Sequence, residues 1–291
     1  MLAEFLQFLF SGLTVGAIYG LIGLGFAVIY NASHVINFAQ GEFVMIGGMA
    51  TVFLMKAGVP MPLAILIAIA GAAAVGWVLA RFGIETARGS TVVGLIIITI
   101  GASILLRGLA QVIWDRNFHA LPAFAGDTPI QILGAALLPQ SLIIGTALVL
   151  TMLGLRLFFE HTRIGKAMQA TAIDPLAAQL VGIDTRRIVR LSFVLSAALG
   201  AMAGVLVAPI TMTYANVGVM LGLKGFAATI VGGLGNPLGA IAGGLIVGIA
   251  EAMTAGYLTS AYKDAVAFII ILFVLLFMPN GLFGRAEVTK V

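Results

Sequence analysis

The chain has 291 residues, of which 61% are hydrophobic and 9% are charged, and its formal net charge is +4. A soluble domain carries about 25% charged residues, so this composition excludes a water-soluble globular protein, because too few polar side chains remain to cover its surface. The small positive charge reports membrane topology rather than nucleic-acid binding, and the lack of cysteine excludes disulfides and thiolate chemistry.

Apolar runs of about 20 residues, each long enough to cross a ~30 Å hydrocarbon layer, recur along the whole length. The ~10-residue alternating segments of a membrane β-barrel do not appear. We therefore expect an all-α polytopic membrane protein with about eight or nine membrane segments, folded as a single transmembrane domain over residues 1–291. The predicted segments are 7–31, 38–56, 61–81, 91–113, 140–158, 188–210, 221–233, 237–257 and 264–284.

The seventh predicted segment, 221–233, is too short to span the membrane comfortably, and the sequence GGLGNP (232–237) closes it. We expect a broken or re-entrant helix here, because irregular backbone at membrane depth is tolerated only where protein or a cavity covers it. Whether this segment crosses the whole membrane stays open.

Lysine and arginine are enriched in cytoplasmic loops, so their distribution along the chain predicts its orientation. Placing the N-terminus outside puts most of the 15 Lys and Arg residues on the cytoplasmic side, and the reverse placement puts most of them outside. We therefore expect the N-terminus outside, the C-terminus in the cytoplasm and the 114–139 loop on the outer face. The cationic residues assigned to the cytoplasmic side are Arg81, Arg88, Arg156, Arg163, Lys166, Arg186, Arg187, Arg190, Arg285 and Lys290.

The two halves of the chain resemble each other weakly when the sequence is shifted by 184 residues, which places Gly16 on Gly200. The first segment would run inward and the sixth outward, so the halves would be inverted repeats, a pattern typical of transporters. The alternative is chance similarity in a sequence rich in Gly and Ala. The positions that match are Gly16, Ala17, Gly20, Tyr30, Val35, Gly41, Ile46 and Gly48 with Gly200, Ala201, Gly204, Tyr214, Val219, Gly225, Ile230 and Gly232.

The charged loop at about 159–187 carries the capping signals of an isolated helix. Asp174 suits the N-cap, Pro175 suits the first helical position, and Gly182 suits the position just past the end. A two-turn helix over 175–181 is therefore predicted. A helix this short is marginal alone, so we expect it to dock in a groove of a partner; the alternative is an ordinary cytoplasmic loop. Its apolar and small residues are Leu176, Ala177, Ala178, Leu180 and Val181.

Polar side chains inside the apolar segments are costly and usually functional. We hypothesise that Glu42 and Lys224 lie near the centre of the protein and pair with each other or with groups of a second subunit; the alternative is that both extend to the membrane surface. Glu251 could line a pathway, serve another helix as an acceptor or act as a proton site, and we expect a structural or interface role. The candidates for intramembrane or translocation roles are Asn37, Gln40, Glu42, Lys224 and Glu251.

Two series of glycines recur at four-residue spacing, a pattern that lets membrane helices approach closely. We expect them to form packing seams, within the chain or with a second subunit, rather than ligand sites. The series are Gly12, Gly16 and Gly20, and Gly235, Gly239 and Gly243.

Catalytic and nucleotide-binding motifs are not found. A phosphate-binding loop requires G-x-x-x-x-G-K-[S/T], whereas the only Gly-Lys pair, Gly165-Lys166, has Glu160 at the first Gly position and Ala167 in place of Ser or Thr. The three histidines have no metal-site spacing. We therefore expect no enzyme activity, no metal and no nucleotide bound by this chain, and a separate energy source.

The stretch GKAMQATAIDPLAAQLVGID (165–184) resembles the cytoplasmic coupling loop of ABC importer permeases, with a degenerate Glu-Ala-Ala pattern. Nearly the whole chain is similar to the branched-chain amino-acid ABC permease family. The similarity rests on GLTVGAIYGLIGLGFAVIY (12–30), NFAQGEFVMIGG (37–48), GFAATIVGGLGNPLGAIAGGLIVGIAE (225–251) and YKDAVAFIIILFVLLFMPNGLFG (262–284).

This resemblance implies an importer in a bacterial plasma (inner) membrane, in which the 174–182 helix docks on an ATPase. It implies a second, homologous permease subunit, two cytoplasmic ATPases that bind ATP and Mg, and an external solute-binding protein. The expected solutes are branched-chain amino acids or related small polar molecules. An ion-coupled secondary transporter with inverted repeats is the alternative, which the scarcity of buried charges disfavours.

Overall fold

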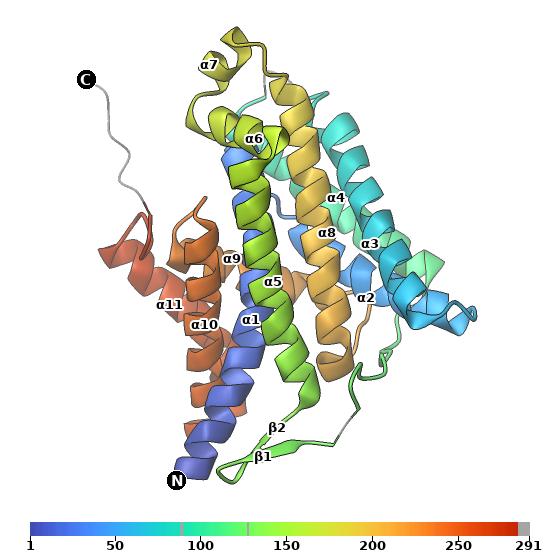
Figure 1. Ribbon diagram of the computed structural model, residues 1–291, viewed down its shortest axis with the longest axis vertical. Coiled ribbons are helices and arrows are strands. Elements are labelled where there is room, and N and C mark those ends of the chain that lie inside the picture. The colour runs from blue at the N-terminus through green and yellow to red at the C-terminus, as the bar shows by residue number, and fades with distance from the viewer. Residues whose placement is uncertain (88–89, 127, 285–291) are drawn as a thin grey trace.

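The computed structural model describes residues 1–87, 90–126 and 128–284, and it is a bundle of long helices (Figure 1). Arg88, Arg285 and Lys290, which contributed to the predicted orientation, lie outside the described residues. The long helices are α1 (Leu2–Ser33), α2 (Gln40–Lys56), α3 (Met61–Val78), α4 (Val92–Ile113), α5 (Pro139–His161), α8 (Thr185–Thr211), α9 (Val217–Gly232), α10 (Pro237–Tyr257) and α11 (Lys263–Phe277). The shorter elements are the π-helix η1 (Leu79–Ile84), the hairpin strands β1 (Ile130–Ile132) and β2 (Ala135–Leu137), α6 (Arg163–Ile173), α7 (Pro175–Leu180) and the 3-10 turn η2 (Ser260–Tyr262).

Within the described ranges, seven helices are long and apolar enough to cross a membrane. Each of the nine predicted segments overlaps one of the long helices, which confirms the all-α polytopic prediction. The first helix is longer than predicted and begins at Leu2, and α3 continues through η1 to Ile84. Local sequence explains where two of the helices begin. Pro139 occupies the first position of α5. Asn236 caps α10 just before Pro237, because its Oδ1 accepts a hydrogen bond from Gly239 N.

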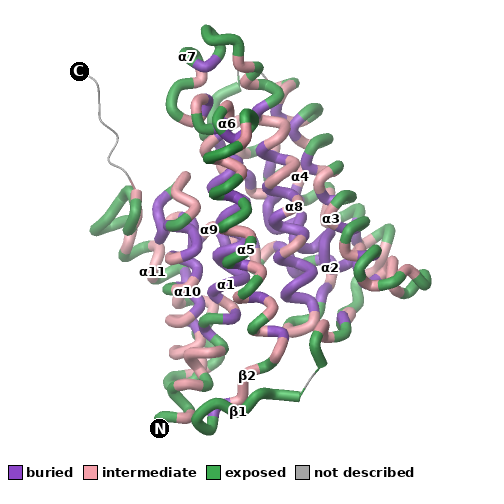
Figure 2. Tube along the Cα trace, in the orientation of Figure 1, coloured by how far each residue is buried: buried purple, intermediate pink, exposed green. Residues whose placement is uncertain are grey.

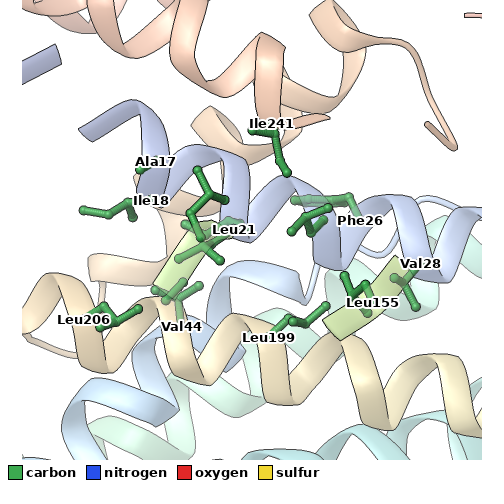
Figure 3. Close-up of a cluster of buried hydrophobic side chains, with 14 of the residues drawn as sticks. Ala17, Ile18, Leu21, Phe26, Val28, Val44, Leu155, Leu199, Leu206 and Ile241 are labelled. Atoms are coloured by element: carbon green, nitrogen blue, oxygen red, sulfur yellow. The ribbon is translucent and has the colours of Figure 1, made fainter. Parts of the chain in front are cut away.

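The helix α1 is the buried centre of the bundle, whereas α4 and α11 expose most of their apolar residues (Figure 2). Leu21, Leu24 and Leu199 belong to the largest core cluster, in which α1 packs against α5, α8 and α10 (Figure 3). Apolar side chains on the outer helices have no core to enter, so these faces are suited to lipid.

The contacts between helices support the predicted inverted repeat. The helix α1 packs on α9 and α10, and α8 packs in the same way on α2 and α3. Figure 1 shows α1 and α8 running in opposite directions. This pairing is the one expected if α1, α2 and α3 correspond to α8, α9 and α10 in reversed orientation.

The glycine series of α1 is a packing seam against α10, as predicted. A Cβ on Gly16 would lie 2.8 Å from the carbonyl oxygen of Gly244, and one on Gly12 would lie 2.7 Å from the Cα of Ile249. A Cβ on Gly20 would lie 3.2 Å from the Cα of Ile241. The two backbones therefore touch along the seam, which a side chain would prevent.

The second glycine series is only partly a seam. Gly239 packs against the carbonyl of Gly232, and Gly243 packs against that of Ala228, so both face α9. The prediction for Gly235 is wrong, because α10 begins at Pro237 and Gly235 lies in the preceding turn. There it has a φ of 81°, a conformation that favours glycine.

The predicted short seventh segment corresponds to α9, which has 16 residues and is about 24 Å long at ~1.5 Å per residue. Its last turn ends at Gly233, where the C-terminal segment covers the backbone. Leu282 N donates to Val231 O at 2.9 Å, and Phe283 N donates to Gly232 O at 3.0 Å. This pairing provides partners for carbonyl groups at a helix end inside the bundle.

Candidate functional site

The predicted isolated helix exists as α7. Asp174 Oδ1 accepts hydrogen bonds from Leu176 N at 2.9 Å and from Ala177 N at 3.0 Å, and Pro175 occupies the first turn. Gly182 follows the helix with a φ of 87°. The capping pattern therefore predicted both ends to within one residue.

The helix α6 was not predicted from the sequence. Thr162 caps it through a hydrogen bond from Gly165 N to Thr162 Oγ1 at 2.9 Å, and Met168 enters the main core cluster. Gly165 packs against the backbone of Phe158, which lets α6 turn across the end of α5 (Figure 1). Thr162 followed by an apolar periodic run was the signal that could have revealed this helix.

The helix α7 lies beyond the end of the bundle that is opposite the N-terminus (Figure 1). Leu180 is 89% exposed, and Leu176 and Val181 are also exposed, whereas Ala178 is buried. An exposed apolar group on a charged loop is unfavourable in water and is typical of an interaction site.

A short linker connects α7 to the buried helix α8. Asp184 Oδ1 accepts hydrogen bonds from Arg186 N at 3.1 Å and Arg187 N at 3.2 Å, so α8 is capped two residues after Gly182 and begins at Thr185. The Gln179 side chain donates to Thr185 Oγ1 at 2.9 Å. A short linker and one side-chain hydrogen bond therefore join α7 to the start of α8.

The start of α8 is also tied to α3 and its π-helical extension. Glu85, just after η1, forms ion pairs with Arg190 Nε and Arg81 Nη1, each at 2.8 Å. Because η1 continues α3, these ion pairs attach the start of α8 to the end of the α3–η1 helix.

Replacing Asp174 by Ala is expected to destabilise α7 by about 1 kcal/mol, because the amides of Leu176 and Ala177 lose their acceptor. Hydrogen exchange of these two amides, measured by mass spectrometry, should accelerate by about fivefold. Asp174→Asn keeps a capping oxygen and is expected to restore slow exchange. Equal exchange in Asp174→Ala and the unmodified protein would contradict the capping role.

Lys224 and Glu251 form a buried ion pair, so the prediction that Lys224 pairs with Glu42 is wrong. Lys224 Nζ lies 2.5 Å from Glu251 Oε1 and 2.6 Å from Asp264 Oδ1. Tyr19 donates a hydrogen bond from its hydroxyl to Glu251 Oε2 at 2.8 Å. Glu251 thus serves other helices as an acceptor, as expected, and the cluster joins α1, α9, α10 and α11.

Glu42 is buried on the other side of the bundle, where it faces α4. Its Oε1 accepts a hydrogen bond from Ser103 Oγ at 2.8 Å and lies 3.6 Å from Arg107 Nε. Sequence reasoning missed both partners, and Arg107, the single cation of the 91–113 segment, was the available signal. The Glu42 group lies beside a cavity of 230 Å³ between α1, α2, α4 and α9.

Gln40 and Asn37 have structural positions. Gln40 Nε2 donates to Ser196 O at 3.1 Å, and Gln40 Oε1 lies 2.6 Å from Ser196 Oγ, so the side chain fixes α2 to α8. Asn37 Oδ1 accepts a hydrogen bond from Ala39 N at 3.1 Å in the turn before α2. Neither residue lines the cavity beside Glu42.

The 114–139 loop lies at the end of the bundle opposite α7 (Figure 1). His119 Nε2 lies 2.8 Å from Asp115 Oδ1, and its Nδ1 lies 2.8 Å from Lys56 Nζ. The hydrogen bond from His119 lowers the pKa of the Asp115 carboxyl below its usual value. Gln7 fixes the β1–β2 hairpin to α1 through hydrogen bonds with Ala136.

A bundle of membrane-crossing helices whose halves pack as an inverted repeat is typical of membrane transport proteins. The chain belongs to the family described as the permease component of branched-chain amino acid transport systems, which matches residues 8–275. As a permease component it is a transport subunit rather than an enzyme.

Individual relatives agree with this assignment. The chain is 37% identical to the high-affinity branched-chain amino acid transport system permease protein LivH of Escherichia coli K12, over 99% of this chain and 98% of LivH. It is 36% identical to the corresponding permease protein BraD of Pseudomonas aeruginosa, over 99% of this chain and 98% of BraD. The fold is similar to PsaBC from Streptococcus pneumoniae in complex with Fab, with a TM-score of 0.51 at 16% identity, covering 96% of this chain and 97% of that one.

Proposed function

We propose that the chain is the membrane-spanning permease subunit of an ATP-binding-cassette importer for branched-chain amino acids. The observation that carries the proposal is α7, a capped helix with exposed Leu176 and Leu180 that is joined to the buried helix α8. The names of LivH and BraD, both high-affinity branched-chain amino acid permease proteins, support the solute class. Related small polar solutes form the wider class.

In this proposal the chain binds no nucleotide, and two cytoplasmic ATPases bind ATP and Mg. A second, homologous permease subunit completes the transport path, and an extracytoplasmic binding protein delivers the solute. Docking on Leu180 lets the ATPases move α7, and the Gln179 and Asp184 contacts carry the movement to α8. ATP can shift the permease only by the free energy with which the ATPases prefer one permease state over the other.

We further propose a location in the bacterial inner membrane with α7 in the cytoplasm. The cationic residues Arg163, Lys166 and Arg186 belong to the end that carries α6 and α7, in keeping with the enrichment of positive charge on the cytoplasmic side. The N-terminus and the 114–139 loop then face outward, where the hairpin Ile130–Leu137 is a contact surface for the binding protein.

The test is solute uptake by the complete transporter, purified with its partner subunits and reconstituted in vesicles. Uptake of radioactive leucine is expected only when ATP, Mg and the binding protein are supplied together. Uptake driven by a sodium or proton gradient without ATP would contradict the proposal and support an ion-coupled secondary transporter. Failure to import leucine, isoleucine or valine under any of these conditions would contradict the solute class.

A further inference from the structure

The cavity beside Glu42 combines charged and aromatic walls. Its volume is 230 Å³, below the ~300–1,000 Å³ of pockets that hold drug-sized ligands, and therefore suited to a smaller solute. The polar wall comes from α2 and α4, and the apolar wall comes from aromatic and aliphatic side chains. The lining residues that the argument uses are Glu42, Ser103, Arg107, Phe26, Phe38 and Phe226.

Glu42 has an unused acceptor at this cavity. Its side chain is 2% exposed, and of its two carboxylate oxygens only Oε1 has partners among the described residues, namely Ser103 and Arg107. Oε2 accepts no hydrogen bond from any residue that the structure describes. A buried carboxylate oxygen without a donor is unfavourable, so the site is complete only when another group supplies one.

Arg107 offers the opposite charge next to this acceptor. Its Nε lies 3.6 Å from Glu42 Oε1, and Nη2 donates to Ser103 Oγ at 3.4 Å. These long contacts leave guanidinium donors free for a further anion, because arginine carries five N–H groups. A carboxylate and a guanidinium side by side match a molecule that carries an ammonium and a carboxylate on one carbon.

We propose that this cavity is a solute-binding site on the translocation path and that it takes an aliphatic α-amino acid. This assignment rests on the proposed function. The solute's ammonium donates to Glu42 Oε2, its carboxylate accepts from Arg107, and its aliphatic side chain packs against Phe26, Phe38 and Phe226. The first two contacts recognise the class of amino acids, and the aromatic wall favours apolar side chains.

The cavity reaches the exposed face of α4. Ile100 and Ile104 of α4 line it and are exposed on the outer face of that helix, so the cavity is not closed off by the core. Gly218 and Gly222 of α9 line the opposite side, where the lack of a side chain lets α9 pack directly against the backbone of Gly41. An open site with only two charged contacts binds weakly, as release during transport requires.

Cysteine protection tests the site directly, because the natural chain contains no cysteine. Val219→Cys places a single thiol in the cavity wall, and Ala261→Cys, at an exposed position in η2, is the matched control. The purified transporter is treated with a small cationic methanethiosulfonate, with and without millimolar leucine and ATP, and labelling of this chain is followed by mass spectrometry. Leucine is expected to slow labelling of Val219→Cys at least threefold and to leave Ala261→Cys unchanged. Equal rates at Val219→Cys with and without leucine would overturn the proposal.

Uptake by variants separates this proposal from the proposed function. Glu42→Gln is expected to lower leucine uptake at least tenfold while ATP hydrolysis continues. The control Glu160→Gln alters an exposed carboxylate and should leave leucine uptake within twofold of that of the unmodified transporter. Val219→Trp fills the cavity without changing the Glu42 group and is expected to abolish uptake even if Glu42→Gln fails to fold. Normal uptake by a folded Glu42→Gln or by Val219→Trp would overturn the cavity proposal alone. Absence of uptake by the unmodified transporter would overturn the proposed function instead.

Discussion

Replacing Lys224 by Met is expected to destabilise the folded permease by about 3–5 kcal/mol, because it leaves the Glu251 carboxylate buried without its cation. Lys224 is 6% exposed and Glu251 is 7% exposed, so water cannot replace the lost partner. Asp264 is half-exposed and remains partly solvated. The melting temperature of the purified protein in detergent, together with its yield from membranes, measures the effect.

Two controls identify the cause of that loss. The double variant Lys224→Met, Glu251→Gln removes both buried charges and is expected to recover most of the stability, because the only carboxylate of the cluster that remains is the half-exposed Asp264. Arg156→Met breaks the exposed Arg156–Glu160 pair and is expected to change stability by less than about 1 kcal/mol. A Lys224→Met protein as stable as the double variant would contradict a stabilising role for the buried pair.

Replacing Gly244 by Val is expected to force α1 and α10 apart and to prevent a functional permease from accumulating. A Cβ on Gly244 would lie 2.5 Å from Gly20 N and 2.7 Å from Gly16 O, and backbone atoms cannot move aside without displacing a helix. Overpacking of a filled core costs about 1–3 kcal/mol or more, and membrane helices depend on such packing for association. Thermal unfolding in detergent and leucine uptake both report the loss.

Gly145 on α5 provides the matched control, because a Cβ there would meet no described atom within 4 Å. Gly145→Ala is expected to leave uptake unchanged and to raise stability by up to about 1 kcal/mol, since alanine favours a helix more than glycine does. Equal melting temperatures for Gly244→Val and Gly145→Ala would contradict the seam.

Local signals in the sequence were sufficient for much of the fold. Apolar runs located every long helix, and the Asp174-Pro175 pair with Gly182 located α7, because capping depends on neighbouring residues alone. The same logic, applied to Thr162, could have located α6. Gly235 was assigned to a seam from spacing alone, although Pro237 marks the start of α10.

The partners of the buried charges could not be predicted in this way. Glu42 and Lys224 are both intramembrane charges of opposite sign, but the rotation of α2 and α9 turns Glu42 toward Arg107 and Lys224 toward Glu251. That rotation depends on contacts with residues far along the chain, such as Asp264 at the start of α11. Spacing within one helix does not contain this information.

Cross-linking from α7 is the most direct test of the claim that an ATPase moves this permease. Leu180→Cys introduces the only thiol of the chain, which is coupled to a benzophenone maleimide and irradiated in the purified transporter. Leu133→Cys, in the hairpin at the opposite end of the bundle, is treated in the same way as the control. The expected result is a product that joins Leu180→Cys, but not Leu133→Cys, to a nucleotide-hydrolysing subunit. A cross-link from Leu180→Cys to the external binding protein, or the absence of any ATPase product, would contradict the coupling role of α7.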